Sequence, residues 1–393
     1  MKQNSIPFDN VVAVAPVTVP YEKKSEKSPH WFIGKAFSTL LARTNLKKSD
    51  IDGLALASYT LVPDSAAVMA DYFKTEFSWV LDMPMGGVSG VIGLKRAARA
   101  IQVGDAEIIA CIGADAMGNK DNFKSLIRDF SCFSRDYVYQ YGAAGPSSLF
   151  AMKTSHYMDM FGAKMEDFGR ICIAQREAAM ENPLALLRKP LSMEDYLCAM
   201  KISDPLRLYD CVMPCSGAEG FLVMSAERAL SLGLPTVKIS SAIESHNAYH
   251  DDEIQFRTGW AKYSDDMYHA AGLGPEDMSF LQAYDDYPVM VMIQIEDLGF
   301  CKKGEGPKFV RETALTVEGQ GLPINTCGGM LSAGQAGAAG GFMSVVEAMR
   351  QLTGEPLGLQ VPSARAGVVS GYGYVNYDRG LCAAAAILQA TDQ

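Results

Sequence analysis

The segment GGVSGVIGLKRAARAIQVGDAEIIACIG, residues 86–113, predicts a glycine-rich turn, a helix and a buried strand in succession. Apolar residues recur at helical spacing through its middle, at Val91, Leu94, Ala98 and Ile101. Residues 107–113 then form a largely apolar run, which is typical of a strand covered on both faces of a sheet. A glycine-led helix that feeds a central strand indicates an α/β protein.

The same alternation of strand and helix patterns continues on both sides of this segment. A short linker at 232–235 divides the chain into a first half, residues 1–234, and a second half, residues 235–393. The second half repeats the first in outline, because the glycine-rich stretch 325–341 again opens a helix. Residues 117–205 have weaker periodicity and several glycine and proline breaks, so we predict a cap or loop region inserted in the first half. Two halves joined face to face place helices between two sheets.

Composition and charge exclude several classes of function. The 393 residues suffice for two domains with full hydrophobic cores, and the formal net charge of −10 disfavours binding to nucleic acid or an anionic membrane. No apolar run reaches the roughly 18 residues of a membrane span, and the start lacks the apolar stretch of a signal peptide, so we expect a cytoplasmic protein. The nine cysteines include no Cys-x-x-Cys pair, so we expect neither a disulfide framework nor a metal site.

Each glycine-rich turn can hold an anion, because a helix N-terminus directs several backbone N–H groups and the positive end of the helix dipole toward one point. Close helix packing explains glycines at such a turn equally well. Two such turns in matching places of the two halves favour an anion site over packing alone.

Four blocks in order resemble the thiolases, in the version of the sterol carrier protein X type. The stretches 87–117, 204–218, 284–301 and 325–335 correspond in turn to the nucleophile loop and its helix, the Pro-Leu and Asp-Cys signature, the His-Asp-Cys-Phe segment, and the Asn-Pro-Ser-Gly-Gly run that ends in Gly-His-Pro. The resemblance covers nearly the whole chain. It implies the thiolase fold: two duplicated βαβαβαββ halves stacked as α/β/α/β/α layers.

The departures from the family's pattern concern the catalytic residues. Gly87 occupies the position of the nucleophilic cysteine, which in those enzymes takes the acyl group. Tyr284 corresponds to the histidine that helps hold the thioester oxygen, and Gln335 to the histidine that activates the cysteine. The stretch 369–373 has no acid/base cysteine where other thiolases carry Cys-x-Gly. The usual thiolase reaction is therefore excluded.

A pocket that has lost its thiol can still stabilise an enolate. We predict that backbone N–H groups beside Gly87 and near Gly371 hold the thioester oxygen of a β-hydroxyacyl-CoA while its Cα–Cβ bond breaks. This retro-aldol cleavage gives a ketone or aldehyde and a shortened acyl-CoA. Tyr284 is the first candidate for the base or its conjugate acid, and Tyr287, Tyr372 and Tyr374 are weaker candidates.

The same pattern resembles the steroid side-chain aldolases, thiolase relatives with tyrosines in place of the family's catalytic residues. This resemblance implies a small zinc-ribbon and OB-fold partner subunit, besides the homodimer expected of a thiolase. Gln335 departs from it, because those enzymes use a second tyrosine near this position, and an amide is neither acid nor base at neutral pH. The proton donor to the enolate is left unassigned.

We expect no covalently bound cofactor, and coenzyme A enters as the thioester substrate. Basic residues in the predicted cap are candidates for contacts to its phosphates, namely Arg128, Arg135, Arg188 and Lys189, with Lys201 beside them. Such residues equally fit a solvated helical face.

Two alternative functions follow from the same residues. Acyl transfer can proceed through an unusual nucleophile such as Cys327 or Cys215. The chain can also be a catalytically inactive acyl-CoA-binding partner subunit, because it lacks every standard catalytic residue of the family.

Overall fold

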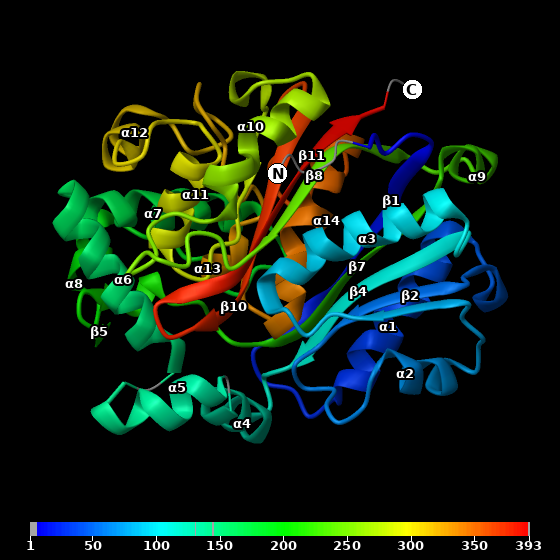
Figure 1. Ribbon diagram of the computed structural model, residues 1–393, viewed down its shortest axis with the longest axis horizontal. Helices are drawn as coiled ribbons and strands as arrows, with labels where there is room; N and C mark the ends of the chain where they lie inside the picture. Colours follow the sequence, from blue (N-terminus) through cyan, green and yellow to red (C-terminus); the bar gives the residue numbers. More distant parts are fainter. Residues whose placement is uncertain (1–5, 130, 144, 392–393) are drawn as a thin grey trace.

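The computed structural model describes residues 6–129, 131–143 and 145–391, and it shows two similar halves around a pair of central helices (Figure 1). The first half follows the order βαβαβαββ. Its elements are β1 (Val11–Glu22), α1 (Pro29–Thr44), β2 (Gly53–Ala57), α2 (Ala66–Phe73), β3 (Trp79–Asp82), α3 (Ser89–Val103), β4 (Ile108–Ala116) and β7 (Ser216–Ser225), followed by the short helix α9 (Ala226–Ser231).

The second half repeats this order with one reduced strand. Its elements are β8 (Thr236–His246), α10 (Gly259–Ala271), β9 (Leu281–Gln282), α11 (Pro288–Asp297), α12 (Gly306–Glu312), α13 (Gly329–Ala333), α14 (Gly340–Thr353), β10 (Ala366–Asn376) and β11 (Arg379–Ala390). The place of the third strand is taken by a single parallel bridge between Leu281 and Ile324. The glycine-led helices α3 and α14 occupy corresponding places in the two element orders.

The two half-sheets are joined into one mixed nine-stranded sheet of order β3-β2-β4-β7-β1-β8-β11-β10-β9. The junction is the antiparallel pair β1–β8, from Val12 opposite Lys238 to Val14 opposite Thr236. The β2–β3, β2–β4 and β9–β10 pairs are parallel, and the others are antiparallel. The sequence predicted the α/β class, which is confirmed, but gave no sign of this junction.

Three hydrophobic clusters show the order of the layers. In β4, Ile108 and Ala110 face the cluster beneath α1 and α2, while Ile109 and Cys111 face the cluster around α3 and α14. In β11, Ala384 faces this same central cluster, and the alternate residues face a third cluster that contains α10 and α11. Alternate residues of each strand point to opposite faces of the sheet, so the sheet lies between α1 and α2 on one side and α3 and α14 on the other, and again between α3 and α14 and the layer of α10 and α11.

The central helices α3 and α14 touch through glycines at their N-terminal ends. A Cβ atom added to Gly90 would lie 2.0 Å from the carbonyl oxygen of Gly341, and one added to Gly341 would lie 2.5 Å from that of Gly87. Each helix follows a short 3₁₀ turn, η2 (Gly86–Val88) before α3 and η6 (Gly337–Ala339) before α14. This close crossing brings the two predicted glycine-rich turns together.

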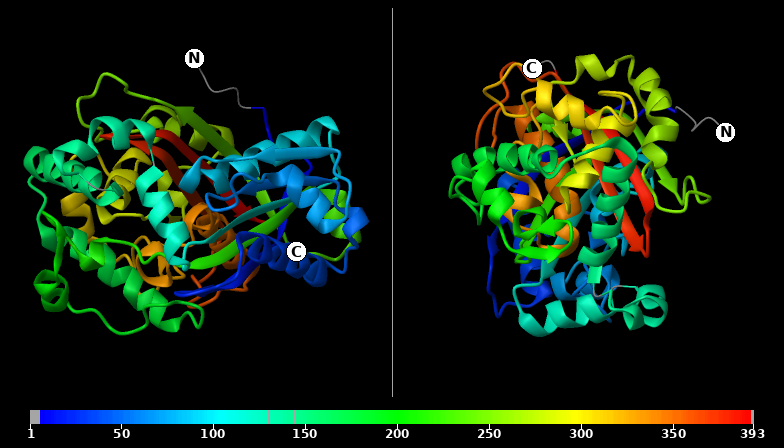
Figure 2. Two further views of the ribbon diagram at one scale, coloured as in Figure 1. Left: turned by 90° about the horizontal axis from the view of Figure 1, so that it is seen from below. Right: turned by 90° about the vertical axis from the view of Figure 1, so that its left-hand side faces the viewer.

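The inserted region is largely helical, although its weak periodicity predicted only a cap or loop. It comprises α4 (Lys120–Asp129), α5 (Cys132–Tyr137), α6 (Gly145–Phe161), α7 (Met165–Glu181), α8 (Met193–Cys198) and the small hairpin β5 (Lys201–Ser203) and β6 (Leu206–Arg207). In Figures 1 and 2, α4 and α5 run along one edge of the molecule, apart from α7 and α8. Helix α6 leads from that edge toward the second half. The inserted region therefore has two parts, α4 and α5 at the edge and α7 and α8 beside the second half.

Candidate active site

A cavity of about 360 Å³ lies where the two halves and the cap meet. Its wall is formed by the loop after β2, the turn η2, helices α4 and α6, the loop before α11, and β10. Seven aromatic residues line this wall: Tyr59, Phe123, Phe150, Tyr284, Tyr287, Tyr372 and Tyr374. Three of the four residues predicted to be catalytic line this cavity, namely Gly87, Tyr284 and Gln335.

The ring of Tyr284 fills the space that a side chain at position 87 would need. A Cβ atom added to Gly87 would lie 1.9 Å from both Cε2 and Cζ of Tyr284, and 2.5 Å from its hydroxyl oxygen. These separations are far below van der Waals contact. The resemblance implies a cysteine at this position in the thiolases, and the Tyr284 ring leaves no room for one here.

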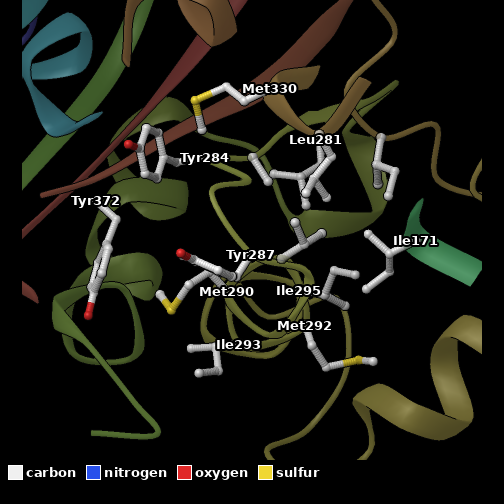
Figure 3. Packing of buried hydrophobic residues seen from close by; sticks show 14 of the residues in the cluster. Ile171, Leu281, Tyr284, Tyr287, Met290, Met292, Ile293, Ile295, Met330 and Tyr372 are labelled. Carbon is white, nitrogen blue, oxygen red and sulfur yellow. The ribbon is translucent and has the colours of Figure 1, made fainter. Parts of the chain in front are cut away.

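The backbone around Tyr284 is fixed on both sides. Its N–H donates to Gln294 Oε1 at 3.0 Å, and its carbonyl accepts from Gln294 Nε2 at 2.7 Å. The preceding Ala283 N–H donates to Asn325 Oδ1 at 2.7 Å. Figure 3 shows Tyr284, Tyr287 and Tyr372 on one side of the core, beside the apolar side chains of α11.

Gln335 is the polar neighbour of the Tyr284 hydroxyl. Its Nε2 donates to the phenolic oxygen at 3.4 Å. The main chain of Gln335 is held by the loop before β7, because its N–H donates to the Met213 carbonyl at 2.8 Å and its carbonyl accepts from Cys215 N–H at 3.0 Å. The phenolic proton of Tyr284 can then be donated to a ligand in the cavity.

Burial raises the pKa of Tyr284 well above its ordinary value, and the neighbouring Asp286 carboxyl adds to this rise. The Gln335 amide opposes the rise but is a smaller influence. The phenol therefore stays protonated at neutral pH. Of the two roles that the sequence left open, base or conjugate acid, the surroundings favour the proton-bearing form.

Gly371 lies behind the cavity wall. A Cβ atom added to it would lie 2.9 Å from the carbonyl oxygen of Gly87 and from the Cα of Val88. Because Gly371 has no side chain, β10 can pass directly against η2. Gly373, two residues further along β10, lines the cavity. The predicted role of backbone N–H groups near Gly87 and Gly371 stays a prediction.

The sequence reasoning missed a carboxylate and an amine at this site. Asp286 lines the cavity although it is only 7% exposed, and burial raises its pKa to about 8. Lys153 of α6 is 3% exposed, and burial lowers its pKa to about 7. Asp286 lies inside the Tyr-Asp-Asp-Tyr segment already singled out, directly before a helix that is buried throughout, and this burial was the available signal. Nothing in the sequence points to Lys153.

The weaker tyrosine candidates also line the cavity. The Tyr287 hydroxyl lies 2.9 Å from Ser147 Oγ, and its ring stacks on Phe150 with centroids 4.2 Å apart. The Tyr372 hydroxyl donates to Gln255 Oε1 at 2.6 Å and accepts from Lys153 Nζ at 2.8 Å. Figure 3 shows the Tyr372 hydroxyl pointing away from Tyr284.

The predicted phosphate-binding residues fall into two places. Arg128 and Arg135 lie on α4 and α5, and α4 also supplies Phe123, Leu126 and Ile127 to the cavity wall. Arg188 and Lys189 lie exposed in the connection between α7 and α8. Within the described part of the chain, none of these four basic side chains lines the cavity.

All nine cysteines are described and free, and of these Cys211 alone lines the cavity. Burial raises the pKa of the Cys211 thiol to about 12. Burial also raises the pKa values of Cys215 and Cys327, and neither thiol reaches the cavity wall.

Among the described residues there is no group of three or more His, Cys, Asp or Glu side chains that could hold a metal ion. Nor does any described helix combine the length and hydrophobicity that crossing a lipid bilayer requires.

Comparisons with known proteins place these features in a family context. Residues 240–386 match the family described as thiolase C-terminal domain-like. The chain is 30% identical over 351 residues to a steroid side-chain-cleaving aldolase of Thermomonospora curvata, covering 85% of this chain and 88% of that protein. It is 29% identical over 348 residues to the 17-hydroxy-3-oxo-4-pregnene-20-carboxyl-CoA lyase of Mycobacterium tuberculosis, covering 85% and 89%.

Two solved structures confirm the thiolase fold. The Ltp2-ChsH2(DUF35) aldolase superposes with a TM-score of 0.83 at 27% identity, and the match covers 98% of both chains. A monomeric SCP2-thiolase like protein of Mycobacterium smegmatis superposes with a TM-score of 0.74 at 15% identity, covering 98% of this chain and 78% of that one. The predicted layered fold is thus found in both.

Proposed function

We propose that this chain, which belongs to the thiolase superfamily and is a thiolase-like carbon–carbon lyase, cleaves a β-hydroxyacyl-CoA by a retro-aldol reaction. One observation carries the proposal: the Tyr284 ring occupies the nucleophile's space at Gly87, so the cavity keeps hydrogen-bonding and acid–base groups without a thiol at that position. Such a site supports carbon–carbon cleavage through an enolate. The named relatives, an aldolase and a carboxyl-CoA lyase, agree with this chemistry.

In the proposed reaction the β-hydroxyl group loses its proton and becomes the carbonyl of the first product. The Cα–Cβ bond breaks, and its electron pair moves into the thioester as an enolate. The neutral Tyr284 phenol donates a hydrogen bond to the enolate oxygen, and Gln335 keeps that hydroxyl in place. Protonation at Cα gives the shortened acyl-CoA, so one proton moves from oxygen to carbon and none is consumed.

The direct test is to incubate the protein with a β-hydroxyacyl-CoA and to identify products by mass spectrometry. We expect equal amounts of a carbonyl compound and a shortened acyl-CoA. Recovery of the intact thioester, together with measurable binding of it, would instead identify an inactive acyl-CoA-binding subunit.

We also propose that the chain works with a partner subunit of the DUF35 type, the zinc-ribbon and OB-fold protein implied by the resemblance. The superposable Ltp2-ChsH2(DUF35) aldolase carries such a component in its name. A homodimer and phosphate contacts from Arg128, Arg135, Arg188 and Lys189 belong to the same proposal. Co-expression with a DUF35-type protein, followed by measurement of the molar mass of the purified complex, tests both the partner subunit and the homodimer.

Substitution at Gly87 tests the shared space with Tyr284. We expect Gly87→Ala to lower the cleavage rate about 10- to 100-fold, because the ring must move by more than 1 Å to admit the methyl group. The measurement is kcat together with a melting curve. A variant that folds normally and keeps the full rate would contradict this placement of the ring.

Cys211 tests the acyl-transfer alternative, because it is the cysteine that lines the cavity. We expect Cys211→Ala to retain cleavage activity within a factor of about three, since burial keeps this thiol protonated and a thiol is a poor nucleophile. Loss of activity, with an acyl adduct on the wild-type cysteine detected by mass spectrometry, would support a covalent route.

A further inference from the structure

The loop that carries Tyr284 also carries two aspartates with different surroundings. Asp285 is held by the N-terminus of α13, because its carboxylate accepts the N–H groups of Met330 at 3.0 Å and Leu331 at 3.1 Å. Asp286 lines the cavity, and its carboxylate accepts the N–H of the adjacent Tyr287 at 3.1 Å. The first aspartate fixes the loop, and the second faces the reaction space.

We infer that Asp286 is the catalytic acid–base group that moves the proton from the β-hydroxyl to the enolate carbon, and that Lys153 is the positioning residue that controls its charge. This inference rests on the proposed function. It assigns the proton carrier that neither Tyr284 nor Gln335 supplies.

Lys153 reaches the site from the cap. Its Nζ donates to the Tyr372 hydroxyl at 2.8 Å and to Gln255 Oε1 at 3.2 Å, and these contacts hold a buried amine behind the aromatic wall. Among the described residues, its charge is the largest opposing influence on the raised pKa of Asp286. When protonated, Lys153 therefore favours the carboxylate form of Asp286, and the Asp286 charge in turn opposes the lowering of the Lys153 pKa by burial.

The other titratable groups around Asp286 are acidic or neutral. Asp285, on the same loop, raises the pKa of Asp286 further. Tyr59 after β2, Tyr372 on β10, and the flanking Tyr284 and Tyr287 all feel the Asp286 charge, and each has a raised pKa, so they stay neutral. Among these groups Lys153 is thus the one whose charge lowers the pKa of Asp286.

The chemistry needs one group that exists in both protonation states near neutral pH. As carboxylate, Asp286 accepts the β-hydroxyl proton while the Cα–Cβ bond breaks. As carboxylic acid, it then gives that proton to Cα of the enolate and returns to its starting form. A pKa of about 8 suits this exchange, because acid–base groups work best with a pKa close to the working pH.

The experiment measures kcat/KM against pH for the chain in complex with its co-purified partner, with a β-hydroxyacyl-CoA as substrate. The carboxylate is the starting form, so wild-type activity should rise with pH through about 8. We expect Asp286→Asn to lose about 10²- to 10⁴-fold in kcat/KM while still binding acetyl-CoA, the probe used in calorimetry. Asp286→Glu, which restores a carboxylate, should recover part of the rate.

Lys153→Met provides the readout that a merely structural role would not give. Removing the ammonium should move the ascending limb to higher pH, because the Asp286 carboxylate loses its stabilising charge; the shift should be small, because the pKa of Lys153, about 7, lies below that of Asp286. A role in packing alone would lower the rate equally at every pH. Asp285→Asn is the matched control: it should lower the melting temperature through its lost contacts to α13, and it should move the ascending limb to lower pH, opposite to Lys153→Met, because Asp285 raises the pKa of Asp286.

The outcomes separate the two levels of the proposal. A wild-type complex that cleaves no β-hydroxyacyl-CoA overturns the proposed function. An active wild type together with an equally active, folded Asp286→Asn variant overturns the assignment of Asp286 alone. An unshifted pH limb in Lys153→Met overturns the role of the lysine.

Discussion

Tyr284→Phe should reduce kcat/KM for cleavage by about 10²- to 10³-fold, because the variant cannot donate a hydrogen bond to the enolate oxygen. The ring itself remains, so the space at Gly87 stays filled and the fold is unaffected. Steady-state kinetics of the complex give the measurement. Since the raised pKa keeps the phenol protonated, its contribution should persist across the neutral range and show no loss as the pH rises toward 9.

Tyr268→Phe is the matched control for this variant. Tyr268 on α10 is also buried, at 5% exposure, and its hydroxyl has no hydrogen-bond partner among the described residues. Removing that hydroxyl should leave the rate unchanged. Comparable losses in both variants would show that a general effect on packing, and not the Tyr284 hydroxyl, governs the rate.

Gly90→Ala should lower the free energy of unfolding by about 3 kcal/mol, the upper part of the range for overpacked cores. The added methyl group would lie 2.0 Å from the Gly341 carbonyl oxygen and 2.8 Å from the Phe342 Cα, and backbone atoms in a helix cannot move aside alone. Helices α3 and α14 must therefore separate. Chemical denaturation followed by circular dichroism measures the loss.

Gly93→Ala on the same helix is the control for helix propensity. Its added Cβ would crowd the flexible end of Met83, 2.9 Å from Cε and 3.3 Å from Sδ, and would lie at an ordinary contact distance of 4.0 Å from Phe342 Cζ. The gain in helix propensity, up to about 1 kcal/mol, opposes the small shift of Met83. Stability should stay within about 1 kcal/mol of wild type. A similarly large loss of stability in both variants would contradict the view that the helix contact at Gly90 is the cause.

The strand and helix pattern predicted much of the fold. The glycine-led helices around 86–102 and 342–352 lie where expected, as α3 and α14. These segments are buried among other apolar residues, so their periodicity survives in the sequence. The β1–β8 junction had no such signature, because pairing between distant strands leaves no local pattern. The cap was underestimated for a similar reason, since its short helices pack on several surfaces at once.

The candidate site was predictable where one residue replaces another in a known segment. Gly87, Tyr284 and Gln335 are such residues, and all three line the cavity. The contact between Gly87 and the Tyr284 ring was not foreseen, because it depends on the exact approach of η2 to the loop before α11. Lys153 was missed because its contact with the Tyr372 hydroxyl, behind the cavity wall, exists only through the docking of α6. The basic residues were grouped by sequence and are spread over two parts of the cap.

The β1–β8 junction also limits how a substrate can enter. Main-chain hydrogen bonds between β1 and β8 join the two half-sheets into one continuous sheet, so the halves cannot separate by a hinge motion without breaking these bonds. Helix α4, which forms part of the cavity wall, is not joined to the sheet by strand pairing and lies with α5 along one edge of the molecule (Figure 1). A movement of α4 would widen the cavity for the proposed acyl-CoA without breaking the pairing between β1 and β8.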